Sequence, residues 1–234
     1  MRMRSFTVGM PRLTALSFVM CSSLPTSMSA SNTKSSSSPA AIGFRVKSGW
    51  AAAVVLTGPV QSPRVLGQSI VELSDPAVPE SRQPHHAGTG AIETDAARVS
   101  RRVQIVRNCT RQSITNLLRN YLSKECTVCH TALAVGSTVD PATISNQHIR
   151  AHALEGQLFR MVLQEVLSAQ GLSCSVVVER RAFAEAAVAL ALADSELKRR
   201  LANLGRETSG PWRAEQKLAA LVAWKALAEG AHTA

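Results

Sequence analysis

Short apolar segments alternate with long helix-period segments through most of this 234-residue chain, and this alternation limits the fold more than any other feature. The runs from Thr131 to Gly136 and from Ser173 to Val178 each lie between segments whose apolar residues recur every three or four positions. Parallel strands must be joined by a crossover, which is usually a helix. The order therefore predicts a sheet whose later strands are parallel and whose faces are covered by helices.

The opening part of the ordered region has a different pattern, which predicts an antiparallel hairpin or meander. Apolar, β-prone residues fill 42–56 and 65–73, and the turn signals Gly58-Pro59 and Ser62-Pro63 separate them. A long loop rich in proline and glycine follows at 75–90. Helices are predicted over 92–122, as one long or two abutting helices, and over 145–170, 182–204 and 214–228.

We expect residues 41–234 to form a single α/β domain and residues 1–40 to be a separate tail. Arginines precede the apolar run from Leu13 to Cys21, which is the pattern of a signal peptide; the alternative is a disordered, serine-rich extension. Five irregularly spaced cysteines favour a reducing, cytoplasmic location, and export follows only if residues 1–30 are a real signal. No apolar run is long enough to predict a membrane span.

The formal net charge of +10 is concentrated at the start of the chain. Seven basic residues precede the first acid, Glu72, so that residues 72–234 hold 19 basic and 16 acidic groups. A globally basic body built to neutralise phosphates is therefore excluded, and a local patch is not. The dense basic stripe in the body comprises Arg98, Arg101, Arg102, Arg107, Arg111 and Arg119.

The element order, together with the segment Ile42-Gly43-Phe44-Arg45-Val46-Lys47-Ser48-Gly49, resembles the RNase H-like fold, which includes Holliday-junction resolvases and related nucleases. The resemblance extends over residues 41–228 in topology and implies a mixed α/β sheet: an opening antiparallel hairpin or meander, then alternating helices and parallel strands. The middle domain of eukaryotic-type peptide-release factors has a comparable order, which implies a translation-linked binding module as a second relative.

The resemblance also implies where catalysis would lie. Members of the fold hold two Mg²⁺ ions with an aspartate of the opening strand and acids from a later strand end and a late helix. Arg45 stands at the position of that aspartate, and Lys47 adds a second cation. Asp140, Glu179 and Glu215 are the remaining candidate catalytic acids. We therefore expect a non-catalytic module that binds nucleic acid or a nucleic-acid-associated partner; its predicted contacts are Arg45, Lys47, Arg98, Arg102, Arg107 and Arg111.

A second hypothesis is an enzyme that uses Mg²⁺ or another divalent metal for phosphoester hydrolysis. His148, His152 and Glu155 lie at positions i, i+4 and i+7, which places them on one helix face and predicts a metal site. Asp140 and Glu179 would complete the cluster. The pair His85-His86, in the loop at 75–90, is expected to be exposed rather than catalytic.

A third hypothesis is an exported c-type haem protein. Cys126-Thr127-Val128-Cys129-His130 has the spacing of a haem-attachment motif, in which Cys126 and Cys129 form thioethers and His130 binds the iron. The apolar, β-branched residues that follow at once favour a buried strand over a haem-lining turn.

Overall fold

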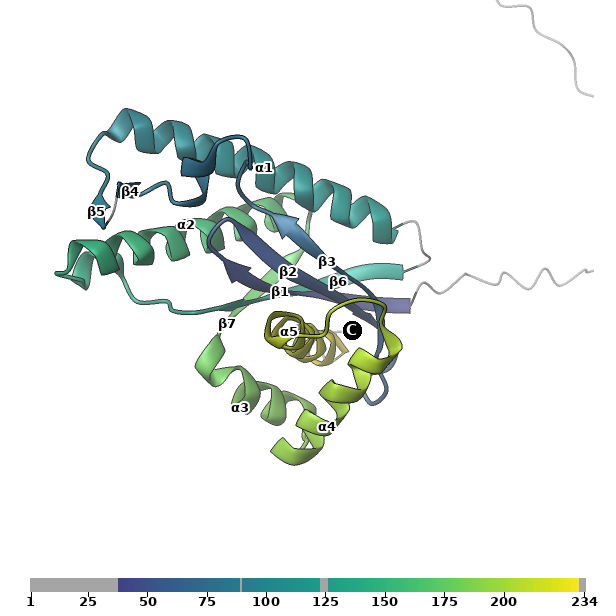
Figure 1. Ribbon diagram of the computed structural model, residues 1–234. Coiled ribbons are helices and arrows are strands. Elements are labelled where there is room, and N and C mark those ends of the chain that lie inside the picture. Colours follow the sequence, from purple (N-terminus) through teal and green to yellow (C-terminus); the bar gives the residue numbers. More distant parts are fainter. Residues whose placement is uncertain (1–37, 89, 123–125, 232–234) are drawn as a thin grey trace, which may run out of the picture. The chain divides into compact units, whose positions relative to one another are not determined.

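The structure, a computed structural model, describes residues 38–88, 90–122 and 126–231, and these residues are organised around a five-stranded mixed sheet (Figure 1). The sheet has the order β3-β2-β1-β6-β7. Its strands are β1 (Ser38–Lys47), β2 (Trp50–Thr57), β3 (Arg64–Glu72), β6 (Cys126–Val135) and β7 (Ser173–Val178). The first three are antiparallel neighbours, and β6 and β7 run parallel to β1. The predicted mixed α/β fold, with an opening antiparallel meander followed by alternating helices and parallel strands, is confirmed.

Five helices connect and cover these strands within the described ranges. They are α1 (Ala96–Leu122), α2 (Gln147–Ala169), α3 (Glu179–Leu190), α4 (Asp194–Leu204) and α5 (Ala214–Ala231). Short 3-10 turns lie at η1 (Pro79–Arg82), η2 (Pro141–Thr143) and η3 (Gly205–Glu207), and the strands β4 (His86–Ala87) and β5 (Ala91–Ile92) form a small separate hairpin.

Two helix predictions are refined by the structure. The segment 92–122 contains one continuous helix, α1, rather than two. The segment 182–204 was expected to be one helix and is two, because Ala191 adopts a left-handed conformation with φ of 50° and ends α3. The break lets α3 and α4 each bury an apolar side in the cluster around α5, with Ala186 from one and Leu201 from the other.

The sheet separates two apolar layers (Figure 1). Side chains alternate along β1, so that Ile42 and Phe44 join the core beneath α1 and α2, whereas Ala41 joins the core around α5. Helix α5 is apolar and buried on almost its whole circumference, because the sheet lies on one side of it and α3 and α4 lie on another. A residue of β1 thus faces one layer or the other according to its position.

Two further predictions concern the N-terminal boundary of the domain and the lack of a membrane-spanning segment. The described residues begin at Ser38, the first residue of β1, so the last three residues of the predicted tail at 1–40 belong to that strand, and residues 1–37 lie outside the described residues. Among the described residues, no helix is both long enough and apolar enough to cross a bilayer.

Candidate functional site

A pocket of about 490 Å³ lies where the parallel strands β1 and β6 end and face the first half of α2. Open α/β sheets commonly bind ligands at this carboxyl edge. Arg45, Lys47, His152 and Arg160 supply the basic side chains of its lining, and no lining residue is an Asp or Glu in the described part of the chain. The pocket is therefore suited to an anion rather than to a hard divalent cation.

Arg45 is buried, with 6% of its surface exposed, and its guanidinium forms an ion pair with Glu179, the first residue of α3. Its Nη1 also donates a hydrogen bond to the carbonyl oxygen of Val46 at 2.9 Å. The expectation that Arg45 contacts nucleic acid stays a prediction; its guanidinium lines the pocket and is engaged by Glu179.

The three predicted catalytic acids are not brought together. Glu179 is paired with Arg45, and the Glu215 carboxylate lies 3.8 Å from the ammonium of Lys47. Asp140 caps η2, where its Oδ1 accepts a hydrogen bond from the backbone N–H of Ala142. Each carboxylate thus has a local partner, and these acids form no three-ligand group among the described residues.

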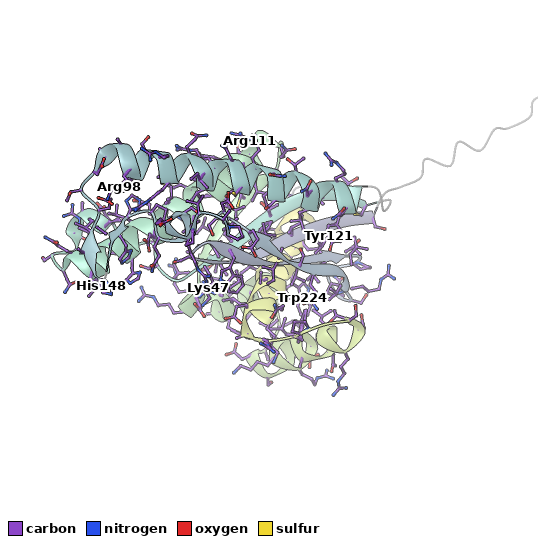
Figure 2. The ribbon with its side chains drawn as sticks, turned by 45° about the horizontal axis from the view of Figure 1, so that its top comes forward. Lys47, Arg98, Arg111, Tyr121, His148 and Trp224 are labelled. Atoms are coloured by element: carbon purple, nitrogen blue, oxygen red, sulfur yellow. The ribbon has the colours of Figure 1, made fainter. Side chains whose placement is uncertain are left out.

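Three of the six arginines in the stripe on α1, Arg98, Arg102 and Arg107, form ion pairs within the protein. Arg98 pairs with Glu93 at 3.1 Å, and Arg107 pairs with Glu165 at 3.5 Å. Arg111 is exposed, and Figure 2 shows it on the side of α1 that faces away from the sheet. Of the four stripe residues predicted to contact nucleic acid, Arg111 is the one for which the described residues provide no ion pair.

Arg102, the fourth of these stripe residues, forms hydrogen bonds to the backbone of the segment before β5. Its Nη1 donates hydrogen bonds to the carbonyl oxygens of Pro84 and His86, both at 3.1 Å, and lies 3.4 Å from Glu93. Its side chain is only 12% exposed. Arg102 therefore fixes the segment that carries His86, and its role as a nucleic-acid contact stays a prediction.

Three histidines form a cluster at the N-terminal end of α2. His148 and His152 lie one turn apart on α2, and His86 is brought to them by the β4–β5 hairpin. One ring nitrogen from each lies within 4.8 Å of the other two, and the ring centroids of His86 and His152 are 4.5 Å apart. Among the described residues this is the one group of three potential metal ligands. The expectation that His86 is exposed was wrong, since this side chain is 7% exposed.

Glu155 lies behind the histidines rather than beside them. Its carboxylate is fully buried, with Oε1 at 2.6 Å from His86 Nδ1 and Oε2 at 3.5 Å from His152 Nδ1. Burial raises the pKa of Glu155, and the hydrogen bond with His86 opposes this rise. The predicted face of His148, His152 and Glu155 is present, but Glu155 supports two rings and is not a member of the ligand group.

The haem-type motif lies inside the sheet. Cys126, Cys129 and His130 belong to β6, which starts five residues before the predicted Thr131 and is paired with β1 and β7. The Cys126 thiol is buried and donates to the carbonyl oxygen of Tyr121 at 3.2 Å, and His130 Nδ1 lies 3.1 Å from Ser173 Oγ. Cys126 to Val128 pair with β1, and His130 pairs with both β1 and β7, so the motif is extended strand, which does not favour attachment of haem.

Comparison with known proteins gives likeness at the level of fold. No family model matches the sequence, and no curated protein matches it. Thermus thermophilus RuvC, solved in complex with a Holliday junction substrate, is similar with a TM-score of 0.49 and 9% identity over 80% of this chain and 90% of RuvC. The yeast mitochondrial Holliday junction resolvase Ydc2 is similar with a TM-score of 0.46 and 8% identity over 82% of this chain and 78% of Ydc2.

Proposed function

We propose that this domain binds the phosphate backbone of a nucleic acid in the pocket at the ends of β1 and β6, and that it does so without cleaving the chain. The observation that carries the proposal is the chemistry of the pocket lining: its ionisable residues are two arginines, a lysine and a histidine, with no Asp or Glu among them. Arg45 is paired with Glu179, whereas Arg160 has no ion pair among the described residues. Basic side chains and backbone N–H groups are the usual phosphate ligands of nucleic-acid-binding proteins.

Two of these cations are placed to reach a ligand. Lys47 is the last residue of β1, and its side chain is 38% exposed. Its ammonium lies 3.8 Å from the Glu215 carboxylate, which is an ion pair longer than a charge-assisted hydrogen bond and leaves the ammonium able to contact a ligand as well. Arg160 comes from α2 on the other side of the pocket, where it lies 3.4 Å from the carbonyl oxygen of Ser137. A phosphate between them would meet two positive groups from two different elements.

The rim of the pocket also offers apolar surface. Val139 and Ile149 are large apolar residues that are 56% and 55% exposed, and both line this pocket. Exposed apolar side chains beside cations suit a ligand that joins a phosphate to a less polar part, as the sugar and base of a nucleotide do. This combination favours nucleic acid over a simple inorganic anion.

The absence of cleavage follows from the state of the acids. Two-metal hydrolysis of a phosphodiester needs carboxylates that are free to hold divalent cations. Glu179 and Glu215, which could serve at this edge of the sheet, are each paired with a cation of β1. Arg45 and Lys47 would repel Mg²⁺ at the same place.

The test is the affinity of the full chain for fluorescently labelled single-stranded, duplex and branched DNA over a range of salt concentrations. We expect the affinity to fall steeply with salt, and Lys47→Ala and Arg160→Ala each to weaken binding and to reduce the slope of log K against log salt by about 0.9. Arg64→Ala is the matched control, since Arg64 is an exposed cation at the start of β3. Equal binding by all four proteins, or DNA cut during the assay, would contradict the proposal.

Divalent-metal-dependent phosphoester hydrolysis is the second candidate, and one observation favours it: His152 belongs both to the histidine cluster and to the pocket lining. A metal held by the cluster would then lie beside the bound phosphate. This candidate predicts DNA cleavage that stops on addition of a chelator and returns with added metal. The binding-only proposal predicts intact DNA with every divalent metal tested.

A further inference from the structure

We propose that His86, His148 and His152 form a binding site for one divalent transition-metal ion, with zinc as the metal that fits the ligands best. The three side chains come from two elements that are far apart in the sequence, the β4–β5 hairpin and the first turns of α2. One nitrogen from each already lies within 4.8 Å of the other two. Convergence of three imidazoles at one point is uncommon for side chains that serve only to cover a surface.

The donor set identifies the class of metal. Three imidazole nitrogens suit zinc and its transition-metal neighbours, whereas Mg²⁺ and Ca²⁺ require oxygen ligands. Zinc binds histidine nitrogen at about 2.0–2.1 Å, which places two tetrahedral ligands roughly 3.4 Å apart. The nitrogens would have to close in by up to about 1.4 Å, and the exposed side chains of His148 and His152 can rotate to do so. A site with three protein ligands keeps its fourth position for water or another small ligand.

Glu155 provides a second, independent observation. Its buried carboxylate faces Nδ1 of His86 at 2.6 Å and Nδ1 of His152 at 3.5 Å. Histidines that bind metals commonly donate their other ring N–H to a carboxylate, which fixes the tautomer and raises the basicity of the coordinating nitrogen. Here the 2.6 Å contact would place the proton of His86 on Nδ1 and leave its Nε2 available for a metal. The approach of His152 at 3.5 Å is too long to fix its tautomer, because Glu155 Oε2 has no hydrogen-bond partner among the described residues.

The Nε2 atom of His86 supports this assignment. It is buried and has no hydrogen-bond partner among the described residues. A buried polar atom is normally satisfied by a partner, and an ordered water or an ion is a common explanation when the protein supplies none. A metal bound by this nitrogen would satisfy it.

The local backbone is built to hold His86 in this position. Arg102 donates to the carbonyl oxygen of His86, and the backbone N–H of Glu93 donates to the carbonyl oxygen of His85 at 2.8 Å. Gly90, with φ of 83°, passes close to the ring of His148, where an added Cβ would stand 3.6 Å from Nδ1. The β4–β5 hairpin therefore holds His86 next to His148 and His152 of α2.

Zinc titration of the full chain, after its metal has been removed with a chelator, tests the proposal. We expect one Zn²⁺ per chain by competition with a chromophoric chelator, and Co²⁺ to give the intense visible absorption of a four-coordinate site. His148→Ala and His152→Ala are the principal variants, because these side chains are largely exposed and their loss leaves the core intact. Each should abolish binding at micromolar zinc, and Glu155→Gln should weaken binding by about 10- to 100-fold.

His130→Ala is the matched control, since it removes a histidine that lies in β6 and is not part of the cluster. It should bind zinc as the wild type does, and circular dichroism should show that all variants are folded. Wild-type protein that binds no zinc would overturn the proposal, as would cluster variants that bind normally. Loss of binding in His130→Ala would instead assign the metal to the cysteine motif of β6. The measurement needs no nucleic acid, so its outcome is separate from that of the DNA-binding test.

Discussion

Gly43 lies in the middle of β1, on the side that faces α5, and replacing it with alanine should destabilise the domain strongly. An ideal Cβ at this position would stand 1.9 Å from the carbonyl oxygen of Ala219 and 2.6 Å from the backbone nitrogen of Ala223. Both are backbone atoms of α5, so no rotation of a neighbouring side chain can relieve the overlap. The helix and the strand would have to move apart.

The size of the effect follows from the geometry. Ordinary van der Waals contact begins at 3.4 Å, so the overlap with the Ala219 oxygen requires a separation of about 1.5 Å more. Overpacking of a well-packed core costs about 1–3 kcal/mol, and we expect about 3 kcal/mol because α5 also packs against β2, β6 and α3. For a domain of this size that corresponds to a fall in Tm of about 6–12 °C.

Thermal and urea unfolding followed by circular dichroism measures this change. Gly156→Ala is the matched control: Gly156 lies within α2, an added Cβ would meet no atom within 4 Å, and alanine should stabilise the helix by about 0.5–1 kcal/mol. The two substitutions add the same methyl group and should have opposite effects. A Gly43→Ala protein as stable as the wild type would refute the close packing of α5 on β1.

Two further predictions concern charged groups. Glu179→Ala should lower the free energy of unfolding by about 1–3 kcal/mol in urea denaturation, because it leaves the buried guanidinium of Arg45 without its counter-ion; an unchanged midpoint would show that this pair contributes nothing. The backbone N–H of Asp95, and then the guanidinium of Arg98, hold the pKa of Glu93 below its ordinary value of 4.5, so the stability that Glu93 supplies is complete above that value and is lost as the pH falls through the lowered pKa. Urea unfolding of Glu93→Gln should therefore differ from wild type at neutral pH and converge with it in acid, and a difference that persists in acid would contradict this cause.

The sequence predicts the layout of this domain well wherever local pattern and tertiary structure agree. The strand at Ser173–Val178 has the predicted bounds, and the helix predicted over 145–170 is found at Gln147–Ala169. The break at Ala191 was missed because an alanine-rich helix carries no local stop signal there. It is closed by backbone hydrogen bonds from Ala191 to Val188 and from Leu192 to Ala187, and it lets α3 and α4 both pack in the cluster around α5, a relation that no short window of sequence contains.

In the candidate site too, the local relations could be predicted from the sequence, and the relations that depend on the fold could not. Spacing alone placed His148 and His152 on one helix face, since that relation is local. His86 could not be added, because only the fold brings the hairpin onto α2. Arg45 and Glu179 were both selected, yet as separate contacts for nucleic acid and metal; their pairing across 134 positions depends on the sheet register and on where α3 begins.

The most direct test of the central claim is to map where DNA touches the protein, by following the backbone amide NMR signals of the full chain during titration with a short DNA duplex. Binding in the proposed pocket predicts shifts concentrated at Lys47, Ser137 and Arg160, with the signals near Arg111 on the outer side of α1 unchanged. Shifts confined to the outer side of α1, or no shifts at low salt, would contradict it.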